Sequence, residues 1–392
     1  MIYTIPIAII ILSYFIVSPL IKHRLIKEFV LLTFSMSFVI IASFRFRTGT
    51  DWQPYFRFFN QSSYNSMLTH YFELFYKLLA VLVKIIFDNY TVFLFIVSMF
   101  FVVEAYSIFV IAEEAFEKYS LPILLLATYM FCFPNFMGGQ RQAIASALCI
   151  LSLKYLIKEK WYVSFFILVC AVLFHTSAII FVINWFIYYL VSDEENKLFR
   201  VNTMSLVLFV SILFGFAYLL LSNISSFTSY NSILIAKLIA YQGMSGVDIS
   251  LDYGMRNFLL ISERILLNLI LVFGLDFYRK TRVTKFIFSS YTFATVFYIF
   301  FIFTARNIAG RGIDYFRFSD MLVLATLPQV LSYSVVGEDE RNRSDYQNYI
   351  GLVIEKLFEF LFVVYIIARF IVIVLYANSI FYLPYRSIFS TP

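Results

Sequence analysis

The chain has 392 residues, of which 61% are hydrophobic, 21% aromatic and only 14% charged, and its mean hydropathy is +0.84. Soluble domains carry about a quarter charged residues, so this composition excludes a soluble globular protein and predicts a polytopic all-α membrane protein. The net charge of +6 is spread through short loops, which excludes the localised basic patch of a nucleic-acid-binding protein.

Apolar runs long enough to cross a membrane recur along the whole chain, since a span needs about 20 residues or somewhat fewer. They are residues 3–21, 28–44, 91–111, 121–136, 142–157, 202–221, 258–277, 286–304, 316–335 and 349–377. We therefore predict about 10–12 transmembrane helices in a single integral membrane domain, residues 1–392.

Two further apolar segments do not read as ordinary spans. Residues 70–87 carry Glu73 and Lys77, which would share one face of a helix, and this predicts a helix lying in the interface. Residues 161–190 are too long for one span and are interrupted at His175, which predicts a broken or re-entrant helix pair.

The orientation follows from the basic loops around residues 22–27, 154–160, 279–285 and 341–343, which belong in the cytoplasm. This places the N-terminus outside, together with the loops at 45–70, 137–141, 222–257 and 305–315. The outer face then collects a set of basic residues with one aspartate and one histidine: Arg45, Arg47, Asp51, Arg141, His175, Arg256, Arg306, Arg311 and Arg317. Arginines gathered against the positive-inside bias predict an anionic ligand, and their forked guanidinium suits a phosphate.

Arg141 is the most informative of these arginines. The stretch Phe133 to Gly139 is predicted to break the chain, and residues 140–142 open the next helix. A helix start favours anions, so Arg141 would complete a phosphate cradle. Gly139, Ala143 and Ala147 form a stripe of small residues that favours close helix packing. The alternative is a simple glycine turn with Arg141 as an interfacial anchor, and Arg45 and Arg47 allow the same reading.

His175 is open to two interpretations, a hydrogen-bonded core residue or a functional group at a helix break. Asp314 is expected to pair with Arg311 or Arg317. The sequence has no nucleotide-binding loop, no HExxH and no GxSxG motif, and its three cysteines show no metal-binding spacing. We therefore expect neither a metal nor another cofactor.

Four stretches, in order, resemble the EpsG-type polysaccharide polymerases, relatives of the Wzy O-antigen polymerases. Arg45 to Tyr55 resembles that family's R-x-G-T-D-x-x-x-Y loop, and Arg141-Gln142-x-x-Ala145 its R-Q-x-x-A helix start. Residues 174–178 are similar to its F-H-x-S-A break, and Arg311 to Phe316 to its R-x-x-x-Y-F. The chain end at residues 383–386, Leu-Pro-Tyr-Arg, is also similar.

The resemblance implies a GT-C-like glycosyltransferase in the bacterial cytoplasmic (inner) membrane, with its active site facing outward. Such enzymes join oligosaccharide repeat units carried on undecaprenyl diphosphate, which supplies both donor and acceptor, and a chain-length regulator is an expected partner. Alternative readings are a flippase for the same lipids, an O-antigen ligase or an acyltransferase.

The expected site combines the resemblance with the chemistry of the residues. Diphosphate contacts are expected from Arg45, Arg47, Arg141 and Arg311, and further substrate contacts from Tyr55, Gln142, Tyr315 and Arg317. Asp51 and His175 are the candidate catalytic residues, and we favour Asp51 as the base and His175 as a donor that positions the substrate.

Overall fold

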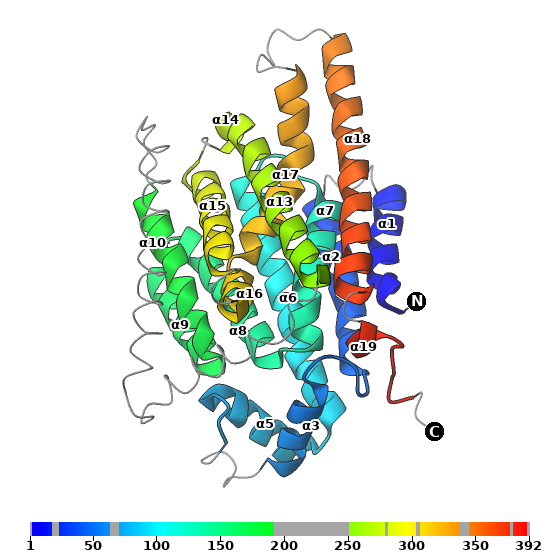
Figure 1. Cartoon of the computed structure of the whole chain (residues 1–392), viewed down its shortest axis with the longest axis vertical. Coiled ribbons are helices and arrows are strands. Elements are labelled where there is room, and N and C mark those ends of the chain that lie inside the picture. The colour runs from blue at the N-terminus through cyan, green and yellow to red at the C-terminus, as the bar shows by residue number, and fades with distance from the viewer. Residues whose placement is uncertain are drawn as a thin grey trace. The chain divides into compact units, whose positions relative to one another are not determined.

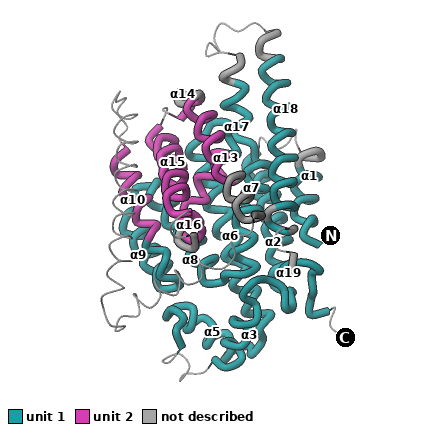
Figure 2. The backbone as a smooth tube through the Cα atoms, viewed as in Figure 1, with its two compact units in different colours: residues 1–179, 324–392 teal, residues 180–323 magenta. Residues whose placement is uncertain are grey.

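The computed structural model describes residues 2–17, 23–62, 70–191, 251–278, 281–302, 306–336, 345–376 and 379–389. These residues form helices joined by short turns, with no strand among them (Figure 1). Two compact units divide the chain: unit 1 comprises residues 1–179 and 324–392, and unit 2 comprises residues 180–323 (Figure 2). The prediction of a single membrane domain remains a prediction.

Unit 1 contains most of the apolar helices. They are α1 (Ile5–Val17), α2 (Arg24–Ser43), α6 (Tyr90–Ala115), α7 (Leu121–Met137), α8 (Gln140–Ile157), α9 (Trp161–Phe174) and α18 (Asp345–Arg369), which continues into a π-helical segment, Phe370–Tyr376. Two shorter helices, α3 (Trp52–Gln61) and α5 (Leu74–Phe87), lie together at one end of this unit (Figure 1). The chain ends with the short helix α19 (Ser379–Tyr382) and an extended segment.

Helix packing in unit 1 combines large aromatic side chains with small polar ones. Phe38 on α2 lies edge-on to Phe101 on α6 and to Tyr129 on α7, with ring centroids 4.5 and 5.4 Å apart. Helices α8 and α9 meet at Ser152 and Ser164, which exchange hydrogen bonds between each hydroxyl and the other residue's carbonyl. Such mutual satisfaction is what polar groups require away from water.

Unit 2 contains α10 (Val182–Leu190), α13 (Leu251–Phe273), α14 (Leu275–Tyr278), α15 (Arg282–Ile302), α16 (Arg306–Asp314) and the first part of α17 (Arg317–Val336). Its interior holds an ion pair in which Arg264 Nη2 lies 2.9 and 3.0 Å from the two carboxylate oxygens of Asp320. Both residues are almost fully buried, so this pair is built into the core of the unit.

Three helices among the described residues, α2, α6 and α15, are long and apolar enough to cross a membrane, and several shorter ones are apolar. The predicted spans correspond closely to α2, α6, α7, α8, α13, α15, α17 and α18. The predicted span 202–221 and the predicted loop 222–257, except for its last seven residues, lie outside the described residues. The helical architecture therefore agrees with an all-α membrane protein.

The predicted external loops 45–70 and 305–315 contain helices α3 and α16, because both segments are amphipathic enough to pack one face. Their place outside the membrane remains a prediction. Three local predictions were wrong. The predicted break at Phe133 begins only at Gly138, since α7 continues through Pro134. Glu73 does not share a helix face with Lys77, because it precedes α5 as its N-cap residue. At Gly139 an added Cβ would meet nothing closer than 3.8 Å, so this glycine makes no close helix contact.

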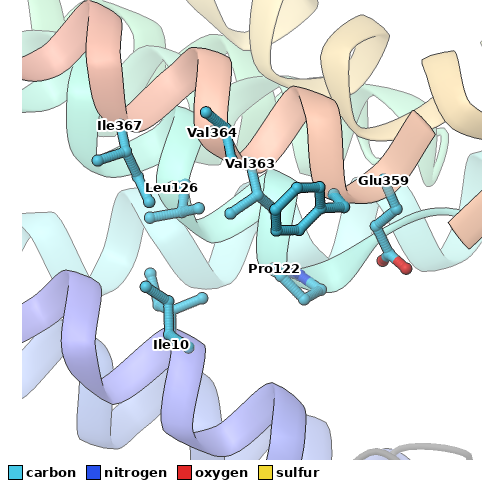
Figure 3. Close-up of a pocket in the computed structure, with 9 residues that line it drawn as sticks. Ile10, Pro122, Leu126, Glu359, Val363, Val364 and Ile367 are labelled. Atoms are coloured by element: carbon cyan, nitrogen blue, oxygen red, sulfur yellow. The ribbon is translucent and has the colours of Figure 1, made fainter. Parts of the chain in front are cut away.

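An apolar cavity of about 180 Å³ lies between α1, α7 and α18 (Figure 3). Ile10, Leu126 and Val363 are among the residues that line it, and Glu359 is its only charged residue. The Glu359 carboxylate already accepts hydrogen bonds from Ser120 and Lys356. The cavity therefore offers apolar surface and no available polar group, and it is a poor candidate for the functional site.

Candidate functional site

The loop that follows α2 is fixed by hydrogen bonds to the C-terminal segment. Phe46 N donates to Arg386 O at 2.8 Å, Ile388 N to Phe44 O at 3.0 Å, and Gly49 N to Phe381 O at 2.9 Å. Gly49 has φ +108°, a conformation open essentially to glycine alone. Two stretches recognised separately in the sequence, the loop and the chain end, are thus brought together.

The same loop packs directly against the turn between α7 and α8. A Cβ on Gly49 would lie 1.8 Å from the carbonyl oxygen of Met137, and one on Gly138 would lie 2.2 Å from Thr50 Oγ1. Both glycines are therefore required by close approach of backbone and side chain rather than by flexibility. The contact fixes the turn from which α8 begins at Gln140.

Arg141, in the first turn of α8, is held from three sides. Its Nη1 donates to Glu73 Oε2 in an ion pair at 2.5 Å, and its Nε donates to the Tyr55 hydroxyl at 3.4 Å. The guanidinium carbon also lies 4.3 Å from the centroid of the Phe72 ring, a cation–π distance. The Arg141 side chain is only 18% exposed, so its orientation is determined by α3 and by the residues that precede α5.

Glu73 connects Arg141 to His175. Its second oxygen, Oε1, lies 3.0 Å from His175 Nδ1 and 3.4 Å from the backbone N–H of Thr176. Burial raises the pKa of the Glu73 carboxyl, but the hydrogen bond from His175 and the charges of Arg141 and His175 outweigh it and lower that pKa to about 2. Glu73 is therefore an ionised acceptor at neutral pH.

His175 lies where the chain leaves helical geometry. Helix α9 ends at Phe174, His175 is extended at φ −155° and ψ 118°, and a 3₁₀ segment, Thr176–Phe181, follows. The histidine is 8% exposed. The break turns both the imidazole and the Thr176 N–H toward Glu73. Whether this part of the chain re-enters the membrane remains a prediction.

A second set of polar groups supports the start of α8. The Tyr76 hydroxyl donates to Gln140 Oε1 at 2.7 Å, and Gln140 Nε2 donates to the Tyr90 hydroxyl at 3.0 Å. All three side chains are buried. The chain thus ties α5, α6 and α8 together beneath Arg141, and Gln142 is also largely buried there.

Arg45 is 1% exposed and lies beneath the C-terminal segment. Its Nη1 donates to Ala42 O at 2.9 Å, while Nε and Nη2 have no hydrogen-bond partner within the described residues. Arg47 and Asp51, by contrast, are exposed, and Arg47 lies over the Phe46 ring. The three charged residues of this loop therefore have different environments.

The structure accordingly brings together four residues of unit 1: Tyr55, Glu73, Arg141 and His175. Arg311, Tyr315 and Arg317 belong to unit 2. There, Arg311 is exposed and Tyr315 is buried. Arg317 forms ion pairs with Asp314 at 3.6 Å and Asp320 at 3.4 Å, which confirms the expected Asp314 pairing for Arg317. The side chains of Arg256 and Arg306 lie outside the described part of the chain.

Several charged residues of the interior were not predicted from the sequence as site or core residues, among them Glu73, Arg264 and Asp320. Glu73 was assigned to a helix surface, although a carboxylate in an apolar segment signals a buried partner. Arg264 and Asp320 lie within predicted spans at positions 258–277 and 316–335, where the same reasoning predicts that they pair. Among the described residues, no group of three or more His, Cys, Asp or Glu side chains is gathered to hold a metal ion.

Comparison with known proteins matches the chain to a family model. The model of the EpsG family matches residues 28–335. This range contains Tyr55, Glu73, Arg141 and His175, and it ends before the C-terminal segment that pairs with the loop after α2. No curated protein and no solved structure matches the chain.

Proposed function

The chain belongs to the EpsG family, and on this basis we propose that it polymerises polysaccharide at the outer face of the bacterial cytoplasmic membrane. Its substrates are oligosaccharide repeat units carried on undecaprenyl diphosphate. The donor is the growing glycan on its lipid diphosphate, and the acceptor is a newly delivered repeat unit. The product is an O-antigen, a capsule or an exopolysaccharide.

The observation that carries this proposal is the placement of Arg141. The guanidinium lies in the first turn of α8, at the positive end of the helix dipole, where an anion is favoured. Glu73, Tyr55 and Phe72 fix its orientation in advance. Nε and Nη1 make the Arg141 hydrogen bonds to described residues, and we propose that Nη2 donates to a phosphate oxygen. A fixed donor of this kind stabilises charge without reorganising during the reaction.

In the proposed reaction, the acceptor hydroxyl oxygen attacks the anomeric carbon of the donor sugar. The bond from that carbon to the diphosphate oxygen breaks, and its electron pair leaves with the lipid diphosphate. Arg141 stabilises the negative charge that builds on this leaving group. A base takes the hydroxyl proton, and Asp51 and His175 are the two candidates.

The other predicted substrate contacts differ in how accessible their side chains are to a substrate. Arg47 and Arg311 are exposed and suit a substrate approaching from water. Arg45 is covered by the C-terminal segment, so its contact with a diphosphate would require that segment to open. We propose that Arg45 instead holds the loop against the end of α2, through its bond to Ala42 O. Gln142, Tyr315 and Arg317 remain proposed secondary contacts.

The test is polymerisation by the purified protein in liposomes, with the lipid-linked repeat unit from the producing cells and a gel that resolves glycan length. We expect the wild type to extend the glycan. Arg141→Ala should reduce the rate by about 10²–10³-fold, as loss of one oriented donor does elsewhere. Arg141→Lys should recover little, because lysine lacks the fork. Arg311→Ala should also abolish long products.

Arg24→Ala is the matched control, because Arg24 forms an exposed ion pair with Glu28 on α2, and its side chain is 62% exposed. This variant should polymerise at the wild-type rate. Two outcomes would overturn the proposal. Movement of lipid-linked repeat units across the bilayer without any change in glycan length would identify a flippase. Transfer of glycan to an acceptor other than the lipid-linked repeat unit would identify a ligase.

A further inference from the structure

Glu73 bridges two residues that are distant in sequence, and its two oxygens have different partners. Oε2 accepts from Arg141 Nη1, while Oε1 lies 3.0 Å from His175 Nδ1. The Glu73 side chain is 8% exposed, so these contacts are made largely away from water. We propose that Glu73 is a positioning residue that orients His175, and that His175, rather than Asp51, takes the proton of the acceptor hydroxyl. This inference rests on the proposed polymerase function.

The protonation of the imidazole follows from the carboxylate. Because the pKa of Glu73 is lowered to about 2, the carboxylate carries no proton at neutral pH and can only accept hydrogen bonds. His175 Nδ1 must therefore be the donor. In the neutral imidazole the other nitrogen, Nε2, then carries no proton and has a lone pair that can accept one. This is the arrangement that a general base requires.

The two carboxylates near the site are less suitable as bases. Glu73 is weakly basic, since its pKa is low and its oxygens are engaged by Arg141, His175 and Thr176. Asp51 is exposed to water and precedes α3 as its N-cap residue, where the positive end of the helix dipole stabilises the carboxylate and reduces its basicity. His175 is only 8% exposed, and Nε2 is the nitrogen that Glu73 does not contact.

The proposed step is balanced as follows. As the acceptor oxygen forms its bond to the anomeric carbon, the hydroxyl proton moves to His175 Nε2. The bond to the diphosphate breaks at the same time, with its electron pair on the leaving oxygen. The resulting imidazolium is stabilised by the Glu73 carboxylate, and it later releases the proton to water.

Charged and titratable groups surround this pair on several elements. Arg141 faces Glu73 from α8, Tyr55 and Asp51 belong to the α3 side, and His70 and Lys77 belong to the segment that includes α5. Replacing Glu73 by Gln removes one negative charge from beside the imidazole while Arg141 stays. An imidazolium without its neighbouring carboxylate forms less readily, so the acid limb of the pH–rate profile should move to lower pH.

The experiment compares Glu73→Gln with Glu113→Gln in the liposome polymerisation assay. Glu113 is the matched control, because it also forms a partly buried ion pair between helices, with Lys27 at 2.7 Å. We expect Glu73→Gln to lower kcat at least about 100-fold without raising KM for the lipid-linked donor. Its acid limb should move down by about one pH unit. Glu113→Gln should match the wild type in all three quantities.

A second comparison separates orientation from folding. His175→Gln should lose as much kcat as Glu73→Gln, and the double variant should lose no more than either, since residues that act as one unit are non-additive. Glu73→Asp, which keeps the charge, should recover part of kcat and the wild-type acid limb. Two results would overturn the inference while the wild type still polymerises. One is a Glu73→Gln variant with the kcat and acid limb of the wild type, and the other is an inactive Asp51→Asn variant together with an active His175→Gln variant. Absence of polymerisation by the wild type would instead refute the proposed function.

Discussion

Replacing Gly49 by alanine tests whether the loop after α2 positions Arg141. Two features of the structure oppose any side chain at this position. The backbone has φ +108°, and an added Cβ would lie 1.8 Å from the carbonyl oxygen of Met137. That oxygen belongs to the last residue of α7, three residues before α8 begins at Gln140. The substitution therefore acts directly on the turn that precedes Arg141.

The expected size of the effect follows from these values. Ordinary contact begins at 3.4 Å, so the loop and the turn must separate by about 1.6 Å if the backbone is otherwise kept. Backbone strain alone costs about 1–3 kcal/mol at such a position. A displacement of about 1 Å in a catalytic group can cost about 10²-fold in rate. We therefore expect Gly49→Ala to lose at least about 1 kcal/mol of stability and about 100-fold in polymerisation.

The assays are thermal unfolding in detergent and polymerisation in liposomes, with Gly139→Ala as the matched control. Gly139 lies in the turn between α7 and α8 that Gly49 contacts. An added Cβ at Gly139 would meet no atom closer than 3.8 Å, and its φ is −82°. We expect this variant to behave as the wild type in both assays. Equal activity of the Gly49→Ala and Gly139→Ala variants would refute the claim that contact with the loop sets the position of Arg141.

Three further predictions concern pH, the buried ion pair and orientation. The pKa of Glu73 is lowered from 4.5 to about 2, so its ionisation stabilises the fold by about 3 kcal/mol above pH 4.5, and this contribution is lost as pH falls toward 2. In thermal unfolding, the stability difference between the wild type and Glu73→Gln should therefore shrink as pH falls from 4.5 to 2. A difference that stays constant over this range would contradict the prediction. Asp320→Asn leaves Arg264 buried beside a neutral partner and should lower the free energy of unfolding by about 3–5 kcal/mol, whereas the double variant Arg264→Met, Asp320→Leu should recover most of that loss. Equal destabilisation of the single and double variants would show that the unpaired charge does not cause the loss of stability. Gln61 and Lys160 are both exposed. In a cysteine-free background, an impermeant thiol reagent added outside should label a Gln61→Cys variant and not a Lys160→Cys variant. The opposite pattern would place Arg141 and His175 at the cytoplasmic side.

The sequence alone determined the class of the protein and the bounds of most of its helices. Long apolar runs cannot be accommodated in a soluble fold, and backbone hydrogen bonding inside a membrane leaves helices as their simplest structure. Hence the predicted spans 28–44 and 121–136 correspond to α2 and α7, which differ from them by four residues at most. The motifs around Arg141 and His175 were visible for the same reason, since charged or titratable residues in apolar surroundings stand out.

Only the tertiary structure decided which of these residues meet. Hydrophobic periodicity places a residue on a helix face, but it carries no information on which segments, separated by dozens of residues, come to lie side by side. Glu73 was therefore assigned to a helix surface, whereas the fold places it between Arg141 and His175. Likewise Arg45 and Arg47 are two residues apart in one motif, yet the C-terminal segment covers the first and leaves the second exposed. Burial and pairing of charge depend on packing between distant segments, and that packing alone distinguished a buried carboxylate bridge from a solvated one.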